Sequence, residues 1–306
     1  MEPLLTQLGV AEAVVRANFL CHKGTWVEWD KPRRFEPFGA DAAGPWRGFQ
    51  AWRADFDSLL LRQAEQLGVC IRQPCRPLHP LVEDGRVVGV VTTDDGPTRA
   101  RFVIDAAGGQ HWLVRHLALE ICPASPPLAC WYSYAEGTCP QRDAAPALVA
   151  DPTGWTWTAR VRPGTYAWTR LSLLPRKGEG PQIDKHWLPE EFKGLRSCGN
   201  PRGANVTWRI VSQTAGAGYF LVGDAAAVLD PVSSHGVLKA IMSGMLAAHF
   251  TATCMQQTGH ESNESEVAEG YGRWMQDWFQ HDVKKLRELY TLFPGIFGLR
   301  SHSILL

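Results

Sequence analysis

One stretch of the chain limits its fold more than any other. Residues 219–238 read YFLVGDAAAVLDPVSSHGVL, an apolar run that stops at a Gly-Asp pair, restarts, and stops again at an Asp-Pro pair. This layout predicts a strand, two turns and then a long helix over 237–257, where apolar residues recur at helical spacing. A helix start exposes unpaired N–H groups and partial positive charge, and Gly236 lets a ligand approach the backbone closely. The stretch therefore predicts a site for an anionic or electron-rich ligand.

Helical and strand patterns alternate along the rest of the chain. Residues 125–210 are rich in Pro, Trp, Thr and Arg and alternate in polarity, which predicts an antiparallel sheet. In the helix over 49–69, Asp55 is a candidate N-cap and Gly68 is the expected stop. The other expected elements are helices over 2–20 and 271–293 and short strands within 69–73, 85–94 and 100–108.

The composition narrows the range of partners. Among 306 residues, 31 lysines and arginines balance 31 aspartates and glutamates, so the net charge is zero and nucleic acid is not expected as a partner. Eight cysteines at irregular spacing favour reduced thiols and no metal site. The chain does not open with a signal peptide, and it holds no window of about eighteen uninterrupted apolar residues. We therefore expect a soluble cytoplasmic protein without a membrane span.

Three segments together resemble one enzyme family. The Gly-Asp-Ala-Ala and Asp-Pro sequences within 223–231 are similar to the flavin-contacting segment of FAD-dependent monooxygenases and halogenases of the hydroxybenzoate-hydroxylase fold. Residues 51–69 resemble their Arg-x-x-Phe-Asp-x-x-Leu helix, and 101–118 resemble their strand, turn and helix around Asp-Ala-Ser-Gly. The segments follow the family's order over most of residues 1–290. Within the family, DPVSSHGVLKA is most similar to flavoproteins near the tryptophan halogenases, including some that oxidise protein tryptophan side chains.

The resemblance assigns roles at the flavin. Asp224 would bind the ribityl chain of FAD, and Pro231 would lie beside the isoalloxazine ring. The amides of Gly236, Val237 and Leu238 would face the N1/O2 edge of that ring. Reduced flavin is anionic at this edge, and a helix start stabilises negative charge.

Five further residues complete the expected cofactor site. Gly223 and Ser234 belong to the same two turns. Asp105 and Gly108 would sit at a strand end near the cofactor. Arg53 would lie close to the phosphate or ribose of FAD, although a surface or capping role fits it equally well.

The chain departs from the family at its start. Members begin with a strand and a Gly-x-Gly-x-x-Gly turn that cradles the FAD pyrophosphate, and this sequence contains neither. The expected fold class is mixed α/β (α+β): an N-terminally truncated, FAD-binding Rossmann-like domain with an inserted antiparallel β-sheet substrate domain. The expected ranges are 1–18, 48–124 and 211–260 for the FAD-binding domain, 19–47 and 125–210 for the substrate domain, and 261–306 for a C-terminal helical segment.

Four residues are candidates for catalysis and substrate binding. His235 lies in the loop expected to touch the flavin, where it would donate a proton, contact the substrate or have a structural role. Lys23 lies near the position of the reactive lysine of halogenases, but a strand-edge lysine is more often simply solvated. Trp155 and Trp157 match the halogenase Trp-x-Trp motif and would line an aromatic pocket or pack in the core. An Ala-Arg pair replaces the Ile-Pro that ends that motif, which weakens the halogenase assignment.

Three functions are consistent with these residues. The first is an FAD-dependent oxidoreductase, a monooxygenase or halogenase-like enzyme, that uses reduced flavin and O2 on an aromatic small molecule or a protein tryptophan. NAD(P)H or a partner flavin reductase would supply its electrons. The second is a truncated, non-catalytic remnant or binding module. The third is a flavin-dependent isoprenoid reductase, because such enzymes share the Gly-Asp segment.

Overall fold

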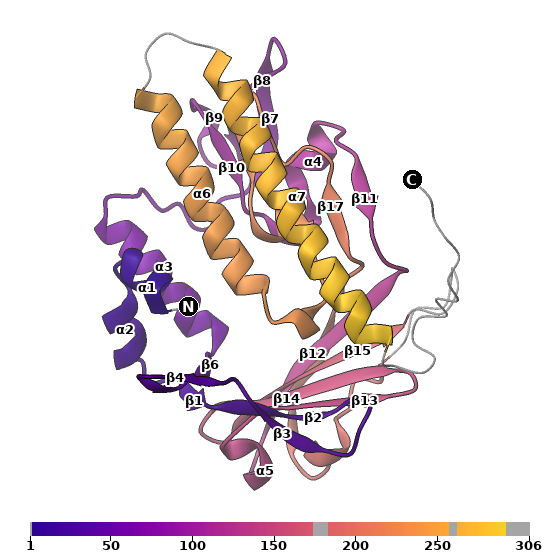
Figure 1. Cartoon of the computed structure of the whole chain (residues 1–306). Coiled ribbons are helices and arrows are strands. Elements are labelled where there is room, and N and C mark those ends of the chain that lie inside the picture. Colours follow the sequence, from indigo (N-terminus) through magenta and orange to yellow (C-terminus); the bar gives the residue numbers. More distant parts are fainter. Residues whose placement is uncertain (1, 174–182, 257–261, 292–306) are drawn as a thin grey trace. The chain divides into compact units, whose positions relative to one another are not determined.

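The computed structural model describes residues 2–173, 183–256 and 262–291 (Figure 1). The chain forms two compact units. We call the first the helical unit; it comprises Cys70–Pro126 and Val206–Leu286. The second, the sheet unit, comprises Glu2–Val69, Pro127–Asn205 and the described residues from Arg287 onward. This division differs from the expected one chiefly because residues 2–18 and 48–69 belong to the sheet unit.

A seven-stranded sheet forms the centre of the sheet unit. Its strand order is β16-β12-β15-β14-β13-β2-β3, and every neighbouring pair is antiparallel except β13 and β2. The expected antiparallel sheet over 125–210 is therefore present, extended by two strands from the N-terminal segment. The strands are β2 (Gly24–Glu28), β3 (Arg34–Pro37), β12 (Leu128–Glu136), β13 (Ala147–Asp151), β14 (Gly154–Arg162), β15 (Thr165–Leu173) and β16 (Arg196–Asn205).

Short elements accompany this sheet. The N-terminal helical pattern divides into two helices because Gly9 takes a left-handed φ of 72° between them. Asp55 lies in the first turn of α3 and does not cap it, whereas Gly68 follows its end as expected. The elements are α1 (Glu2–Gln7), α2 (Ala11–Arg16), α3 (Arg53–Gln66), α5 (Pro140–Asp143), η2 (Glu190–Phe192), β1 (Leu20–His22), β4 (Ala40–Asp41), β5 (Gly44–Pro45) and β6 (Gly48–Gln50).

Trp155 belongs to the core of the sheet unit. Its side chain is 1% exposed, and its indole Nε1 donates to the hydroxyl of Tyr290 at 2.8 Å. Tyr290 is equally buried and packs edge to face against Trp29. These contacts favour the core interpretation of Trp155, whereas Trp157 is only half-buried.

Removing the Tyr290 hydroxyl tests this hydrogen bond. We expect Tyr290→Phe to lower the free energy of unfolding by about 1 to 2 kcal/mol, because the buried indole N–H of Trp155 loses its acceptor. Urea denaturation measures the change. Tyr132→Phe, at an exposed tyrosine, is the matched control. Equal losses in the two variants would contradict the expectation.

The helical unit contains three small sheets. In one of them, β10 and β19 run parallel, which places Asp105 opposite Leu221 at the ends of the two strands. The sheets are β7-β8-β9, β10-β19-β18 and β11-β17-β20. Their strands are β7 (Pro77–Glu83), β8 (Arg86–Thr92), β9 (Gly96–Arg99), β10 (Val103–Asp105), β11 (Ile121–Pro123), β17 (Arg209–Val211), β18 (Ala215–Gly216), β19 (Tyr219–Leu221) and β20 (Ala227–Val228).

The expected strand at 69–73 was wrong. Those residues carry no strand, and the first strand of the β7-β8-β9 sheet begins at Pro77. β7 contains Pro77 and Pro80, which makes it a poor strand by sequence pattern. It occupies an edge of its sheet, where a missing N–H is tolerated.

Two long helices lie side by side, α6 (Gly236–Gln256) and α7 (Ser262–Thr291) (Figure 1). The helical unit contains α6 and α7 up to Leu286, and the rest of α7 belongs to the sheet unit. Both expected C-terminal helices are therefore present. Along α7, buried apolar residues recur every three or four positions, which gives the helix one inward face. They are Tyr271, Met275, Phe279, Val283, Leu286 and Tyr290. The short helices are α4 (Trp112–His116), η1 (Gly108–Gln110), η3 (Gly223–Ala225) and η4 (Pro231–Ser233).

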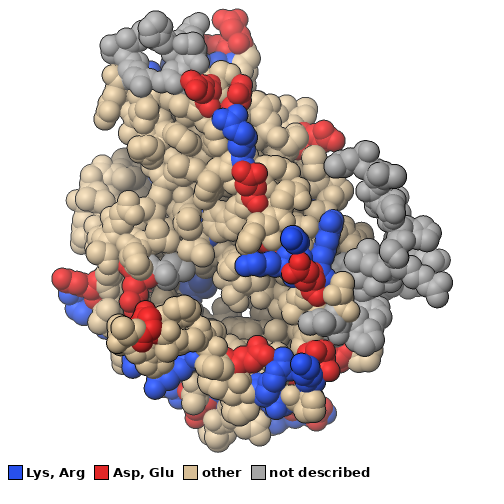
Figure 2. Space-filling model, in the orientation of Figure 1, with Lys and Arg blue, Asp and Glu red and all other residues tan. Residues whose placement is uncertain are grey.

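Helix α6 is strongly apolar although few of its residues are buried. Lys239 is its only charged residue, and the surface over α6 in Figure 2 is mostly uncharged. By length and composition α6 could cross a membrane, with 22% of its most apolar window buried. Core helices of water-soluble proteins pass the same test, so one such helix is a weak indication of a membrane span.

Candidate cofactor site

The turn that follows β19 holds Asp224 outward. Gly223 has a left-handed φ of 56°, and its N–H donates to Ser243 Oγ on α6 at 2.9 Å. A Cβ at Gly223 would lie 3.2 Å from the Cβ of Ala240, so the turn packs too closely on α6 for a larger residue. The Asp224 side chain is 53% exposed.

A buried lysine compensates the charge of Asp224. Lys239 Nζ lies 3.1 Å from Asp224 Oδ1 and also donates to the carbonyl oxygen of Ala227. The lysine side chain is only 6% exposed, so its charge depends on these partners. The arrangement fixes one carboxylate oxygen of Asp224 and leaves its exposed side able to accept hydrogen bonds from ligand hydroxyls.

Asp105 organises the turn that follows β10. Its Oδ1 accepts the N–H of Ala107 and its Oδ2 accepts the N–H of Leu113, both at 2.8 Å. His111, the residue before α4, does not cap the helix with its side chain. The carboxylate of Asp105, six residues before His111, instead accepts the N–H of Leu113 in the first turn of α4. Asp105 therefore lies at the end of a strand, as predicted, with both carboxylate oxygens hydrogen-bonded to backbone amides.

A buried His–Arg pair joins the two turns. His111 Nδ1 lies 2.9 Å from the carbonyl oxygen of Ala225, and Arg209 Nε donates to His111 Nε2 at 2.8 Å. Arg209 also donates to the carbonyl oxygens of Thr207 and Gly109. Since Arg209 can only donate, His111 is neutral with its proton on Nδ1. This network ties the η1 turn to the η3 turn that carries Asp224.

The pair predicts a loss of stability in acid. Burial lowers the pKa of His111 below its ordinary value of about 6.5, and the nearby Arg209 cation adds to this effect. Below about pH 6.5 the unfolded chain therefore binds a proton that the folded chain refuses, so stability falls as the pH falls, until the lowered pKa is passed.

We expect the free energy of unfolding to decrease by up to about 1.4 kcal/mol per pH unit for each such histidine below pH 6.5. Burial also lowers the pKa of His22 in the sheet unit, so the same slope is expected from that group. Urea unfolding at pH 7.5, 6.5 and 5.5 measures the trend. NMR titration of the ring assigns the trend to His111. A His111 ring that protonates at or above its ordinary pKa of about 6.5 would contradict the expectation.

Hydrogen bonds of the buried Asp230 side chain organise the loop before α6. This side chain is 1% exposed; its Oδ1 accepts the N–H of Val232 and its Oδ2 accepts Trp208 Nε1 at 3.3 Å. Ser233 Oγ donates to the Asp230 carbonyl oxygen, and Ser234 follows with a left-handed φ of 55°. The loop thus reverses the chain and leads directly into Gly236.

The start of α6 is open. Its first backbone hydrogen bond within this turn runs from the N–H of Lys239 to the carbonyl oxygen of His235. The earlier amides, those of Gly236, Val237 and Leu238, are the ones a helix leaves without intrahelical acceptors. A Cβ on Gly236 would meet no atom within 4 Å, and the same holds for Gly108. An electron-rich ring edge can therefore approach these amides, so the residues present fit the flavin part of FAD.

His235 pairs with a buried carboxylate. Its Nδ1 lies 3.0 Å from Oδ2 of Asp282, which α7 supplies. The Asp282 side chain is 3% exposed, whereas the His235 side chain is 41% exposed. The ring is consequently anchored on one side and accessible on the other.

Four predicted residues lie in the sheet unit. Arg53 is 62% exposed and forms a two-pronged ion pair with Asp57, one turn along α3. Lys23 is exposed between β1 and β2. Trp155 and Trp157 lie on β14. The helical unit, in contrast, holds all the other predicted cofactor residues together with His235.

Sequence reasoning missed four residues of this site: Lys239, His111, Arg209 and Asp282. Each is polar and at most 9% exposed. The only local signal was an isolated charge inside an apolar helix, which applies to Lys239 and to no other member of the set. The partners of the others lie 47 to 114 residues away along the chain.

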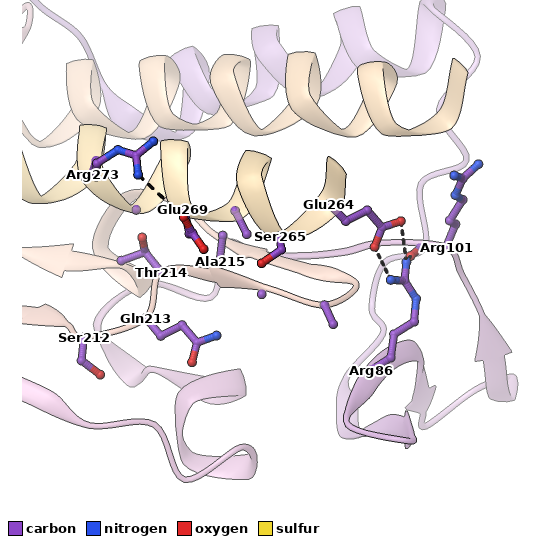
Figure 3. Close-up of a pocket in the computed structure, with 14 residues that line it drawn as sticks. Arg86, Arg101, Ser212, Gln213, Thr214, Ala215, Glu264, Ser265, Glu269 and Arg273 are labelled. Atoms are coloured by element: carbon purple, nitrogen blue, oxygen red, sulfur yellow. Dashed lines mark hydrogen bonds and ion pairs between the residues drawn. The ribbon is translucent and has the colours of Figure 1, made fainter. Parts of the chain in front are cut away.

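A separate cavity of about 930 Å³ opens in the helical unit, between β18 and the first turns of α7 (Figure 3). None of the predicted site residues lines it. Its arginines already have partners: Arg86 pairs with Glu264, and Arg101 donates to the carbonyl oxygen of Cys254 at 2.6 Å. Arg273 lies 3.8 Å from Glu269. Two of the three arginines are thus paired with glutamates, whereas Arg101 has a neutral carbonyl oxygen as its partner.

Known proteins share this architecture. The structure of the myxobacterial chondrochloren halogenase CndH, an FAD-dependent halogenase, superposes with a TM-score of 0.81 at 23% identity, over 94% of this chain and 71% of that one. The fold, with its parallel β10/β19 pair followed by a turn and a long helix, is thus that of the FAD-dependent halogenases, and the expected mixed α/β class is confirmed.

Sequence comparisons also find similarity to flavin-dependent enzymes. The tryptophan halogenase family matches residues 34–168. Tryptophan 2-halogenase from Chondromyces crocatus is 27% identical over 91% of this chain and 57% of its own length. Digeranylgeranylglycerophospholipid reductase from Methanoculleus marisnigri is 24% identical over 80% of this chain and 62% of its own length. The chain is thus similar to tryptophan-halogenase-like FAD-dependent flavoproteins, and it spans about 60% of the length of these two relatives.

Proposed function

We propose that this chain carries the flavin-contacting part of a halogenase-like FAD-dependent oxidoreductase that acts on an aromatic substrate. The observation that carries the proposal is the open start of α6 beside Gly236, in a fold whose solved relatives include FAD-dependent halogenases. The named substrate of tryptophan 2-halogenase supports an aromatic, tryptophan-derived substrate. NAD(P)H or a partner flavin reductase is the proposed electron source, and the cytoplasm is the proposed location.

Each residue has a proposed task. The amides of Gly236, Val237 and Leu238 hold the electron-rich edge of the ring system and stabilise negative charge there. Asp224 accepts hydrogen bonds from ligand hydroxyls, and Lys239 keeps its carboxylate in place. Bound FAD supplies the redox chemistry itself, so the protein contributes binding, orientation and electrostatics.

The sequence contains no Gly-x-Gly-x-x-Gly turn, so the pyrophosphate of FAD has no recognised cradle among these residues. Titration of the purified chain with FAD, followed by the quenching of flavin fluorescence, tests the proposal. We expect saturable quenching that FMN reproduces in part, because the flavin end carries the contacts. A chain that quenches neither flavin would refute the proposal and favour the non-catalytic alternative.

A second candidate function is reduction of isoprenoid double bonds. The similarity to a digeranylgeranylglycerophospholipid reductase, together with the apolar helix α6, favours it. The two candidates separate in one assay with FAD and a chemical reductant. Oxygen-dependent and halide-dependent change of tryptophan supports the first, and oxygen-independent saturation of a geranylgeranyl lipid supports the second.

A further inference from the structure

The structure pairs His235 with Asp282 in a way that determines which nitrogen of the ring is basic. A carboxylate can only accept hydrogen bonds, so the contact of 3.0 Å places the histidine proton on Nδ1. In the neutral ring, Nε2 then carries the lone pair. The two residues lie 47 positions apart, and the pairing joins the loop before α6 to the middle of α7.

The side chains of Asp282 and His235 differ in their exposure to solvent. Asp282 is 3% exposed, so it meets no ligand directly, whereas the His235 side chain is 41% exposed. The backbone also fixes the ring: the N–H of His235 donates to Ser233 Oγ at 3.4 Å, and its carbonyl oxygen accepts the N–H of Lys239 at 2.8 Å. The exposed part of the ring therefore has a defined position at the open start of α6.

We propose that Asp282 is a positioning residue that makes His235 a proton acceptor and donor at the flavin-contacting helix start; the catalytic part rests on the function proposed above. A proton leaves an acidic group of the substrate and binds His235 Nε2, while the electron pair of the broken bond stays with the substrate. The carboxylate of Asp282 balances the charge of the resulting imidazolium. The return of the proton restores the neutral ring. His235 would be the catalytic residue, because it alone is accessible.

The first test determines the tautomer of His235 in the absence of any cofactor. Long-range ¹H–¹⁵N NMR of the imidazole rings in the 306-residue chain should show His235 as the Nδ1–H form. Asp282→Asn should convert it to a mixture of forms or to the Nε2–H form. Asp277→Asn, an exposed aspartate on the same helix, is the matched control and should change nothing. An Nε2–H ring in the native chain, which requires no variant to fold, would overturn the proposal.

The second test reads basicity and location. Carbethoxylation by diethyl pyrocarbonate, followed by mass spectrometry, should modify His235 about tenfold more slowly in Asp282→Asn than in the native chain. Exposed His281 should react equally in both and serves as the internal standard. Equal rates at His235 would overturn the role of Asp282, and restoration of the rate by Asp282→Glu would support it over a purely structural effect.

Saturating FAD should protect His235 and leave His281 reactive. Flavin that binds, as judged by fluorescence, without protecting His235 would overturn the catalytic part of this proposal. Absence of flavin binding would instead refute the proposed function, and with it that catalytic part. The pairing of Asp282 with His235 would then be judged by the ring spectra and carbethoxylation rates alone.

Discussion

Asp105→Ala is expected to lower the free energy of unfolding by about 3 to 5 kcal/mol, because two buried or part-buried amides lose a charged acceptor at once. One of these amides, that of Leu113, lies at the start of α4, where no other side chain caps the helix. Urea denaturation of the 306-residue chain measures the loss. This effect is large enough to leave many domains partly unfolded.

Two further variants isolate the cause. Asp105→Asn keeps the size and one carbonyl acceptor, so roughly half of the loss is expected. Asp94→Ala removes an exposed aspartate and should change stability by less than about 0.5 kcal/mol. If Asp105→Ala were no more destabilising than Asp94→Ala, the carboxylate would not be organising the turn after β10.

Gly236→Val is expected to weaken flavin binding by about 100-fold, which corresponds to about 2.7 kcal/mol. The added side chain would occupy the open space in front of the first amides of α6. Because a Cβ there meets no neighbouring atom within 4 Å, folding should be unaffected. Flavin fluorescence titration and thermal unfolding together separate the two effects.

Gly244→Val provides the matched control on the same helix. A Cβ on Gly244 also meets no atom within 4 Å, but this residue lies two turns beyond the start of α6. It should bind flavin as the native chain does. If both variants, or neither, lost affinity, the helix start could not be the place where the flavin binds.

The long elements of the fold were predictable from local pattern. Residues 237–257 repeat apolar positions with helical period, and the observed helix α6 agrees within one residue at each end. The antiparallel sheet over 125–210 follows from alternation of polarity in the same way. Strand β7 was missed because Pro77 and Pro80 argue against a strand unless an edge position is known in advance. The grouping of residues 2–18 and 48–69 with the sheet unit depends on tertiary contacts, which have no local pattern.

The residues of the candidate site likewise fall into those that the local sequence predicts and those that depend on distant partners. Gly223, Asp224 and Gly236 all lie within the segment 223–236, around recognisable turns, so the local sequence and its family resemblance placed them together. The contacts of His111 with Ala225 and of Asp282 with His235 cross 114 and 47 residues, respectively. A histidine or an aspartate within a helical or turn sequence reads as a surface residue until its distant partner is known.

The hydrogen bonds between the η1 and η3 turns have a consequence for how a ligand would leave. The N–H of Val222 donates to the Asp105 carbonyl oxygen, and the ring of His111 contacts the carbonyl oxygen of Ala225, so each turn is fastened to the other at two points. Movement of one turn away from the other would break both contacts. We therefore expect entry and release of a bound ligand to depend on movement of segments outside these turns. The two turns themselves should keep their positions during ligand exchange.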